Sequence, residues 1–128
     1  MKKLLLTVFT ILLLHSAFSQ NTAWYVDEDA AFKQAKELYD KEKYNTAQKL
    51  FFDVYEKHKD EQTLIKSLSQ FYIAQCAVRL FNADAEYYSV KFIEENPNSP
   101  LVNDAYFSLG GYFYTIKRWD DALKSYEK

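Results

Sequence analysis

Glycine, proline and cysteine are scarce in this sequence of 128 residues. It contains two glycines, two prolines and one cysteine. Because so few turn-forming residues are present, a sheet of many short strands is disfavoured and long helices are favoured. A single cysteine also excludes an intramolecular disulfide.

An excess of charge of either sign is also absent. The chain has 16 basic and 18 acidic residues, and no basic patch is interleaved with aromatic residues. Such a balance produces no field that would attract nucleic acid. We therefore expect no nucleic-acid partner. Apolar residues make up 48% of the chain and aromatic residues 18%, which is enough for a small folded domain.

The residues needed for catalysis are few. His15 lies in an N-terminal apolar segment, which leaves His58 and Cys76 as the remaining histidine and cysteine. One histidine and one cysteine make neither a catalytic triad nor a zinc site. No glycine-rich loop follows a strand, so that route to phosphate binding is missing. We predict a protein that is not an enzyme and holds no cofactor or metal.

We expect His58 and Cys76 to lie in different environments. His58 stands in a lysine-rich break between apolar segments, so we expect it at the solvated surface. Cys76 stands in an apolar helical stretch and is expected to behave as a small buried hydrophobe. A reactive or intermolecular thiol is the alternative for Cys76.

The N-terminus has the layout of a secretory signal peptide. Lys2 and Lys3 precede an apolar run over 4–14, and small residues follow at Ala17 and Ser19. The run has about eleven residues, whereas a bilayer span needs roughly twenty. We predict a signal peptide at 1–19 and a mature domain at 20–128 without a membrane span. An uncleaved anchor is the alternative.

From Glu28 onward apolar residues recur at intervals of three and four, which is typical of amphipathic helices and not of strands. Short polar breaks divide this part into six helices, at 41–43, 58–61, 82, 96–100 and 117–118. In the fourth break, Ser99 is expected to cap a helix whose first residue is Pro100. The predicted fold is all-α, with antiparallel helical hairpins.

The second helices of the three hairpins share a register. Ala47, Ala85 and Ala122 are separated by 38 and 37 residues. A small residue at that place lets two helices approach closely. The sequence therefore predicts three repeats of one helical hairpin.

The last hairpin resembles the tetratricopeptide repeat. It reads Tyr106-x-x-Leu109-Gly110-x-x-Phe113, followed by Ala122-x-x-x-Tyr126. The first hairpin is similar but looser, and the middle one is looser still, with an inter-helix loop one residue short. The resemblance implies hairpins stacked as a right-handed superhelix, an α-solenoid. The residues of the first hairpin that fit the pattern are Ala35, Leu38, Tyr44, Ala47 and Phe51.

The long repeat spacing and the segment Asn96-Pro97-Asn98-Ser99-Pro100 are similar to periplasmic tetratricopeptide proteins of Gram-negative bacteria. These include outer-membrane assembly lipoproteins and coordinators of the Tol–Pal system. The resemblance implies an exported protein, periplasmic or associated with the outer membrane. The last hairpin is incomplete at Lys128 and no capping helix follows, so we expect further repeats of a longer chain. Pairing with a second copy is the alternative.

In tetratricopeptide proteins the first helix of each hairpin lines a concave groove. By position, the resemblance places Phe32, Phe71 and Phe107 at the fifth residue of each repeat. They either form an apolar ladder in the groove or pack between adjacent hairpins. Phenylalanine there departs from the carboxylate clamp of the chaperone-binding members. The predicted partner-binding residues are Phe32, Lys36, Tyr39, Phe71, Gln75, Arg79, Phe107, Gly111 and Tyr114.

Two adjacent glycines in the last hairpin have different expected roles. Gly110 matches the small-residue position of the repeat and is interpreted as a packing glycine. Gly111 should weaken its helix by about 1 kcal/mol relative to alanine. It is either a tolerated defect or a place where a partner's backbone approaches.

The expected function is a protein–protein interaction scaffold or adaptor of the bacterial cell envelope. Its partner would be a protein or peptide bound in the concave groove, as an amphipathic helix or an extended apolar segment. The alternative is a helical-repeat receptor for a glycan or another small ligand, because 11 tyrosines and 10 phenylalanines could stack on sugars.

Overall fold

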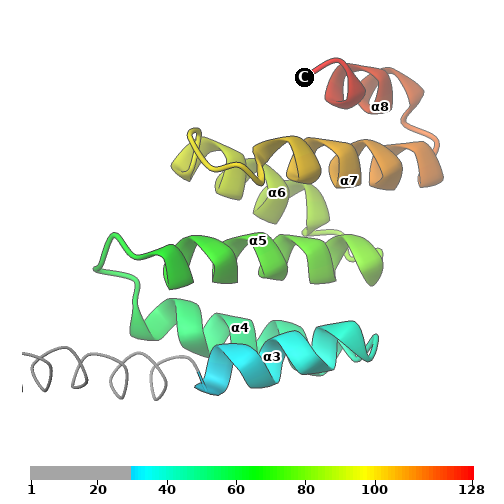
Figure 1. Ribbon diagram of the computed structural model, residues 1–128. Helices are drawn as coiled ribbons and strands as arrows, with labels where there is room; N and C mark the ends of the chain where they lie inside the picture. Colours follow the sequence, from blue (N-terminus) through cyan, green and yellow to red (C-terminus); the bar gives the residue numbers. More distant parts are fainter. Residues whose placement is uncertain (1–29) are drawn as a thin grey trace, which may run out of the picture. The chain divides into compact units, whose positions relative to one another are not determined.

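The computed structural model describes residues 30–128, and this part of the chain contains six α-helices and no strand. The prediction of an all-α fold is thereby confirmed. The predicted signal peptide at 1–19 and the start of the mature domain lie outside the described residues. Figure 1 shows the helices, which are α3 (Ala30–Asp40), α4 (Tyr44–Lys57), α5 (Leu64–Arg79), α6 (Ala85–Glu95), α7 (Val102–Thr115) and α8 (Trp119–Tyr126).

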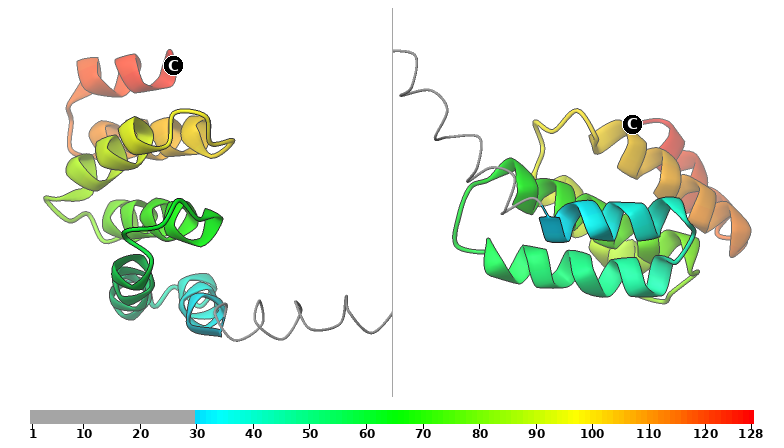
Figure 2. Two further views of the ribbon diagram at one scale, coloured as in Figure 1. Left: turned by 90° about the vertical axis from the view of Figure 1, so that its left-hand side faces the viewer. Right: turned by 60° about the horizontal axis from the view of Figure 1, so that its bottom comes forward.

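Successive helices run in opposite directions and form three antiparallel pairs, α3/α4, α5/α6 and α7/α8 (Figure 1). Between pairs, α4 packs on α5 and α6 packs on α7, and α5 also contacts α7. Within the described part, α3 and α8 lie at opposite ends of this succession (Figure 2). The first helices of the second and third pairs therefore lie side by side. No helix in residues 30–128 combines the length and apolar character needed to cross a bilayer.

The same hydrogen-bonded turn joins the two helices of every pair. In the first pair, the Glu42 N–H donates to the Tyr39 carbonyl at 2.9 Å, and the Lys43 N–H donates to the Leu38 carbonyl at 2.8 Å. This is the Schellman arrangement, in which a left-handed residue ends the helix. Phe81 and Lys117 take the place of Glu42 in the other two turns, with φ of 54° and 64° against 58°.

These turns give a structural register for the helix pairs. Phe32, Phe71 and Phe107 each precede their left-handed residue by ten positions, so they hold equivalent places in the first helices. Ala47 and Ala122 follow it by five positions, whereas Ala85 follows Phe81 by four. The middle loop is thus one residue short, as its sequence indicates.

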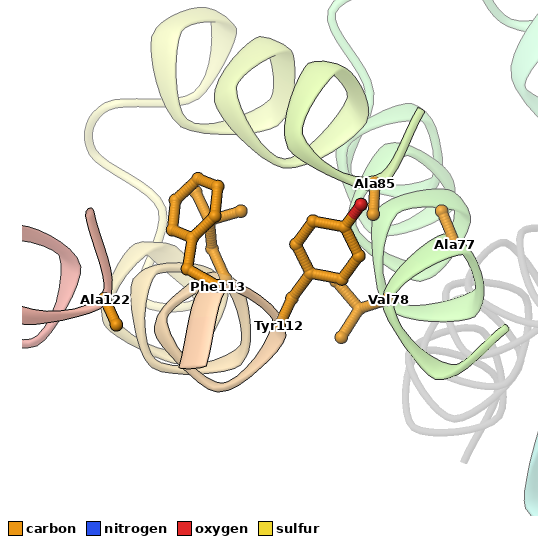
Figure 3. Close-up of a cluster of buried hydrophobic side chains, with 7 residues drawn as sticks. Ala77, Val78, Ala85, Tyr112, Phe113 and Ala122 are labelled. Carbon is orange, nitrogen blue, oxygen red and sulfur yellow. The ribbon is translucent and has the colours of Figure 1, made fainter. Parts of the chain in front are cut away.

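The aligned alanines are buried where helices approach each other. In the cluster between the second and third pairs, the Tyr112 ring of α7 points toward Ala77, Val78 and Ala85 (Figure 3). Its hydroxyl donates a hydrogen bond to the carbonyl of the half-buried Asn82 at 3.1 Å, which gives the phenol a partner within the protein. Small side chains on α5 and α6 therefore make room for a large one from α7.

Gly110 packs against the second helix of its own pair, as predicted. A Cβ atom at Gly110 would lie 2.6 Å from Cε1 of Tyr126. Non-bonded carbon atoms do not approach each other so closely. The absence of a side chain at Gly110 is therefore what lets the Tyr126 ring lie on α7.

The start of α7 differs from the prediction. The α-helix begins at Val102, and Pro100 and Leu101 form a turn before it. The Ser99 carbonyl accepts from the Val102 N–H, and Ser99 Oγ accepts from the Leu101 N–H at 3.3 Å. Ser99 therefore organises a tight four-residue turn over 99–102, and the first α-helical bond runs from the Ala105 N–H to the Leu101 carbonyl.

Cys76 is fully buried, as expected, and burial raises the pKa of its thiol to about 12. The expectation for His58 is wrong, because its side chain is only 3% exposed. The His58 backbone N–H bonds to carbonyls in the last turn of α4, which holds the residue against that helix. Its Nδ1 lies 3.1 Å from a Glu61 carboxylate oxygen, and its buried Nε2 has no hydrogen-bond partner among residues 30–128.

Candidate functional site: a hollow on the first-helix side

Residues from all three helix pairs line one surface hollow of about 450 Å³, called here the first-helix hollow. Three of the predicted groove residues, Arg79, Phe107 and Gly111, line it together. They come from α5 and α7, whose direct packing brings them to one place. The complete lining is Glu42, Tyr44, Val78, Arg79, Phe81, Phe107, Ser108, Gly111, Tyr112 and Thr115.

The walls of the first-helix hollow include exposed aromatic rings. Phe107 is 69% exposed and Phe81 is 58% exposed. Phe81 holds a left-handed backbone conformation, which is costly for a bulky residue and places its ring at the rim. The sequence analysis missed Phe81 because no glycine marks that turn. Its equivalence to Glu42, the left-handed residue of the first turn, is visible only in the structure.

Arg79 connects the hollow to Tyr39 of α3. Burial raises the pKa of the Tyr39 hydroxyl, and a hydrogen bond with Arg79 acts in the opposite direction. The Tyr39 ring lies 5.2 Å from the ring of Tyr44, which lines the hollow. Tyr39 therefore borders the hollow through both Arg79 and Tyr44.

Lys36 extends this surface along α3. Its ammonium lies 5.8 Å from the ring centre of Tyr39 and 5.5 Å from that of Tyr72, within the range of cation–π attraction. A hydrogen bond to Asp40 raises the pKa of Lys36. Because Lys36 already has these partners, its charge is partly satisfied within α3 and α5.

The three equivalent phenylalanines have different surroundings. Phe71 is 8% exposed and lies 5.4 Å from the Phe92 ring, so it belongs to the core. Phe32 is half-buried and lies 5.5 Å from the Phe51 ring. Only Phe107 stands open to solvent. A uniform ladder of three exposed rings is therefore absent from the described residues, and Phe107 is the ring that the hollow presents.

The last two predicted residues, Gln75 and Tyr114, are also absent from the lining of the first-helix hollow, as are Phe32, Lys36, Tyr39 and Phe71. Gln75 is buried beneath it, where its side-chain oxygen accepts a hydrogen bond from Ser108 Oγ at 3.0 Å. Tyr114 is exposed and its ring lies 4.8 Å from that of Trp119. Gln75 thus positions Ser108 in the hollow, and Tyr114 belongs to a surface shared with α8.

A second hollow of about 450 Å³ lies along α6 and is lined by side chains of that helix alone, among them Tyr87 and Val90. The first-helix hollow differs because residues of three helix pairs build it and four of them are aromatic, whereas Tyr87 is the one aromatic residue that lines the α6 hollow. Pockets that bind ligands are typically concave, mostly apolar and supplied with a few polar groups. On these grounds the first-helix hollow is the better candidate site.

Within residues 30–128, no group of three or more histidine, cysteine, aspartate or glutamate side chains is placed to hold a metal ion. Comparison with known proteins found no matching family model, no matching curated protein and no matching solved structure.

Proposed function

We propose that this protein is a non-enzymatic interaction scaffold or adaptor that grips a partner polypeptide in the first-helix hollow. The observation that carries the proposal is the meeting of Arg79, Phe107 and Gly111, from two different helices, in one hollow. An exposed aromatic anchor, a guanidinium and an open backbone position suit an apolar segment with polar flanks.

We further propose that the three helix pairs are tetratricopeptide-type repeats stacked as a right-handed superhelix. Three equivalent turns and a shared position for small residues support this proposal. In such a stack each pair rests on the one before it, and the first helices form one continuous surface. The first-helix hollow lies on that surface.

The proposed location is the periplasm or the outer membrane of a Gram-negative bacterium. This proposal rests on the pattern of residues 1–19, which lie outside the described part of the structure, and on the resemblance of the repeats. A full-length chain expressed with this N-terminus should be recovered after export with residues 1–19 removed, as N-terminal sequencing would show.

The groove is tested by capture from cell-envelope extracts with the 128-residue chain as bait. We expect one defined protein partner, and we expect Phe107→Ala to weaken its binding at least about tenfold, because a buried aromatic anchor contributes roughly 2 kcal/mol. Phe107 is a suitable target because it is exposed, whereas removal of the buried Phe71 would also leave a cavity.

The matched control is Tyr87→Ala, which removes a ring of similar exposure from α6 on the other hollow. It should leave binding unchanged. If both variants lose the same amount of partner binding, or if Phe107→Ala still binds the partner fully, the first-helix hollow is not the binding site.

A glycan or small-ligand receptor remains the second candidate function. It is favoured by the aromatic lining of the hollow, because tyrosine and phenylalanine rings such as Tyr44 and Phe81 provide faces on which sugars stack. A glycan array probed with the full chain distinguishes the two functions. Binding to a defined glycan that is lost in Phe107→Ala would favour the receptor over the scaffold.

A further inference from the structure

The third helix pair exposes a contiguous set of large apolar side chains. The α8 residues Trp119, Leu123 and Tyr126 are 53%, 59% and 47% exposed, and Phe107 and Tyr114 on α7 are more exposed still. With full aromatic side chains offering about 150–250 Å² each, this set exposes roughly 600 Å². Apolar patches of this size on soluble proteins usually mark an interaction surface.

Two of these rings repeat an arrangement found inside the first pair. The ring centres of Phe107 and Tyr126 are 5.5 Å apart, and those of Phe32 and Phe51 are also 5.5 Å apart. The match follows from the register, because Phe51 and Tyr126 each stand four residues after their aligned alanine. Phe107 and Tyr126 are therefore the structural equivalents of Phe32 and Phe51.

In the first pair, a third ring fills the space against these two. Tyr72 of α5 stacks on Phe51 at 5.0 Å with an interplanar angle of 12°, and it meets Phe32 edge-on at 6.0 Å. The incoming ring therefore comes from the first helix of the following pair. The corresponding place against Phe107 and Tyr126 has no such ring among the described residues.

The position of Leu123 gives a second, independent match between the third helix pair and the first. It stands one residue after its aligned alanine, as Gln48 does on α4. The Gln48 amide donates a hydrogen bond to the Ile73 carbonyl of α5 at 3.1 Å. The position that α4 uses to contact α5 is thus occupied on α8 by an exposed leucine, which suits an apolar contact.

We propose that the α7/α8 face docks an amphipathic α-helix that lies against α8 as α5 lies against α4. The helix would pack one aromatic side chain against both Phe107 and Tyr126, as Tyr72 packs on Phe51 and Phe32, and would place apolar residues over Leu123. Head-to-tail stacking of a second copy is disfavoured, because none of the exposed large apolar side chains in residues 30–128 belongs to α3. This second surface is separate from the proposed role of the first-helix hollow, although Phe107 borders both.

The test uses a peptide with the sequence of residues 63–80, which spans α5 and its Thr63 cap. Acetylated, amidated and fluorescently labelled, it is titrated with the 128-residue chain under reducing conditions, and anisotropy is measured. We expect saturable binding. The matched peptide with Tyr72→Ala should bind at least about tenfold more weakly, because it lacks the ring that packs against Phe107 and Tyr126.

Protein variants locate the binding face. Leu123→Glu should weaken binding at least about tenfold, since it puts a charge in the apolar contact. Tyr87→Glu, on α6, should bind as the unaltered chain does. Leu123 is exposed, so the helical circular-dichroism signal of the variant should be unchanged, which separates lost docking from lost folding.

Three results would overturn the proposal. They are absence of peptide binding, equal binding of both peptides, and equal binding by the Leu123→Glu chain. If no peptide binds, and sedimentation shows a dimer that dissociates in the Leu123→Glu variant, the face is an interface with a second copy instead.

Discussion

At the scale of single residues, Gly110 and Gly111 show how neighbouring identical residues acquire different roles. The Tyr126 ring occupies the space that a Gly110 side chain would need. A Cβ at Gly111 would meet only Tyr126 Oη at 3.7 Å, an ordinary contact, and would otherwise face the first-helix hollow. Gly110 is thus required for packing, whereas the packing around Gly111 leaves room for a side chain.

We therefore predict opposite outcomes for two alanine substitutions. Gly111→Ala should raise the free energy of unfolding by about 1 kcal/mol, the usual gain in a helix interior. Gly110→Ala should show no such gain and should be destabilising, because Tyr126 has to leave its place on α7. Urea denaturation with matched m-values measures both changes. Equal stabilisation by the two substitutions would contradict the role assigned to Tyr126.

The sequence predicted residue roles well where helical periodicity governs them. The burial of Cys76 and of the aligned alanines followed from apolar spacing, and Gly110 followed from the repeat register. His58 and Phe81 could not be predicted in this way, because both lie at helix ends. There the hydrogen bonds of the last turn, rather than periodicity, decide which way the side chain points.

At the scale of elements, the three turns within the helix pairs carry conformational strain. Each has a left-handed residue that is not glycine, at Glu42, Phe81 and Lys117. This conformation costs roughly 1–2 kcal/mol for residues with a side chain. At Glu42 and Phe81 the strained residue also lines the first-helix hollow, whereas Lys117 does not.

We predict that glycine at these turns stabilises the fold. Lys117→Gly and Glu42→Gly should each raise the free energy of unfolding by about 1 kcal/mol, because glycine adopts the left-handed conformation without a steric penalty. Phe81→Gly should stabilise in the same way but weaken binding in the hollow. Thermal unfolding together with the partner-capture assay measures both effects. Destabilisation by all three substitutions would show that the turns are held by their side chains instead.

Helix boundaries were predictable to within a few residues, and the exception is informative. Polar breaks correctly separated all six helices. The sequence placed the start of α7 at Pro100, two residues before the observed start at Val102. Serine followed by proline favours a tight turn as strongly as it favours the start of a helix. Only the Ser99–Val102 hydrogen bond distinguishes the two, and sequence spacing does not show it.

At the scale of the whole described part, residues 30–128, the core is a succession of clusters that join neighbouring helix pairs. One joins the first and second pairs around Phe51 and Ile73, and another joins the second and third around Tyr112 and Phe113. The sequence predicted the pairs but not which aromatic residues each cluster would bury. The middle pair is covered on both sides, which is why Phe71 is buried while its equivalent, Phe107, is exposed.

The central claim is that the first helices of the three pairs share one polypeptide-binding surface. Hydrogen–deuterium exchange of the full chain, with and without the captured partner, tests it most directly. The account predicts slower exchange in α5 and α7 around Arg79 and Gly111 and in the turn at Glu42, with no change along the exposed side of α6. Protection confined to the Tyr87 and Val90 segment of α6, with none in α5 or α7, would contradict it.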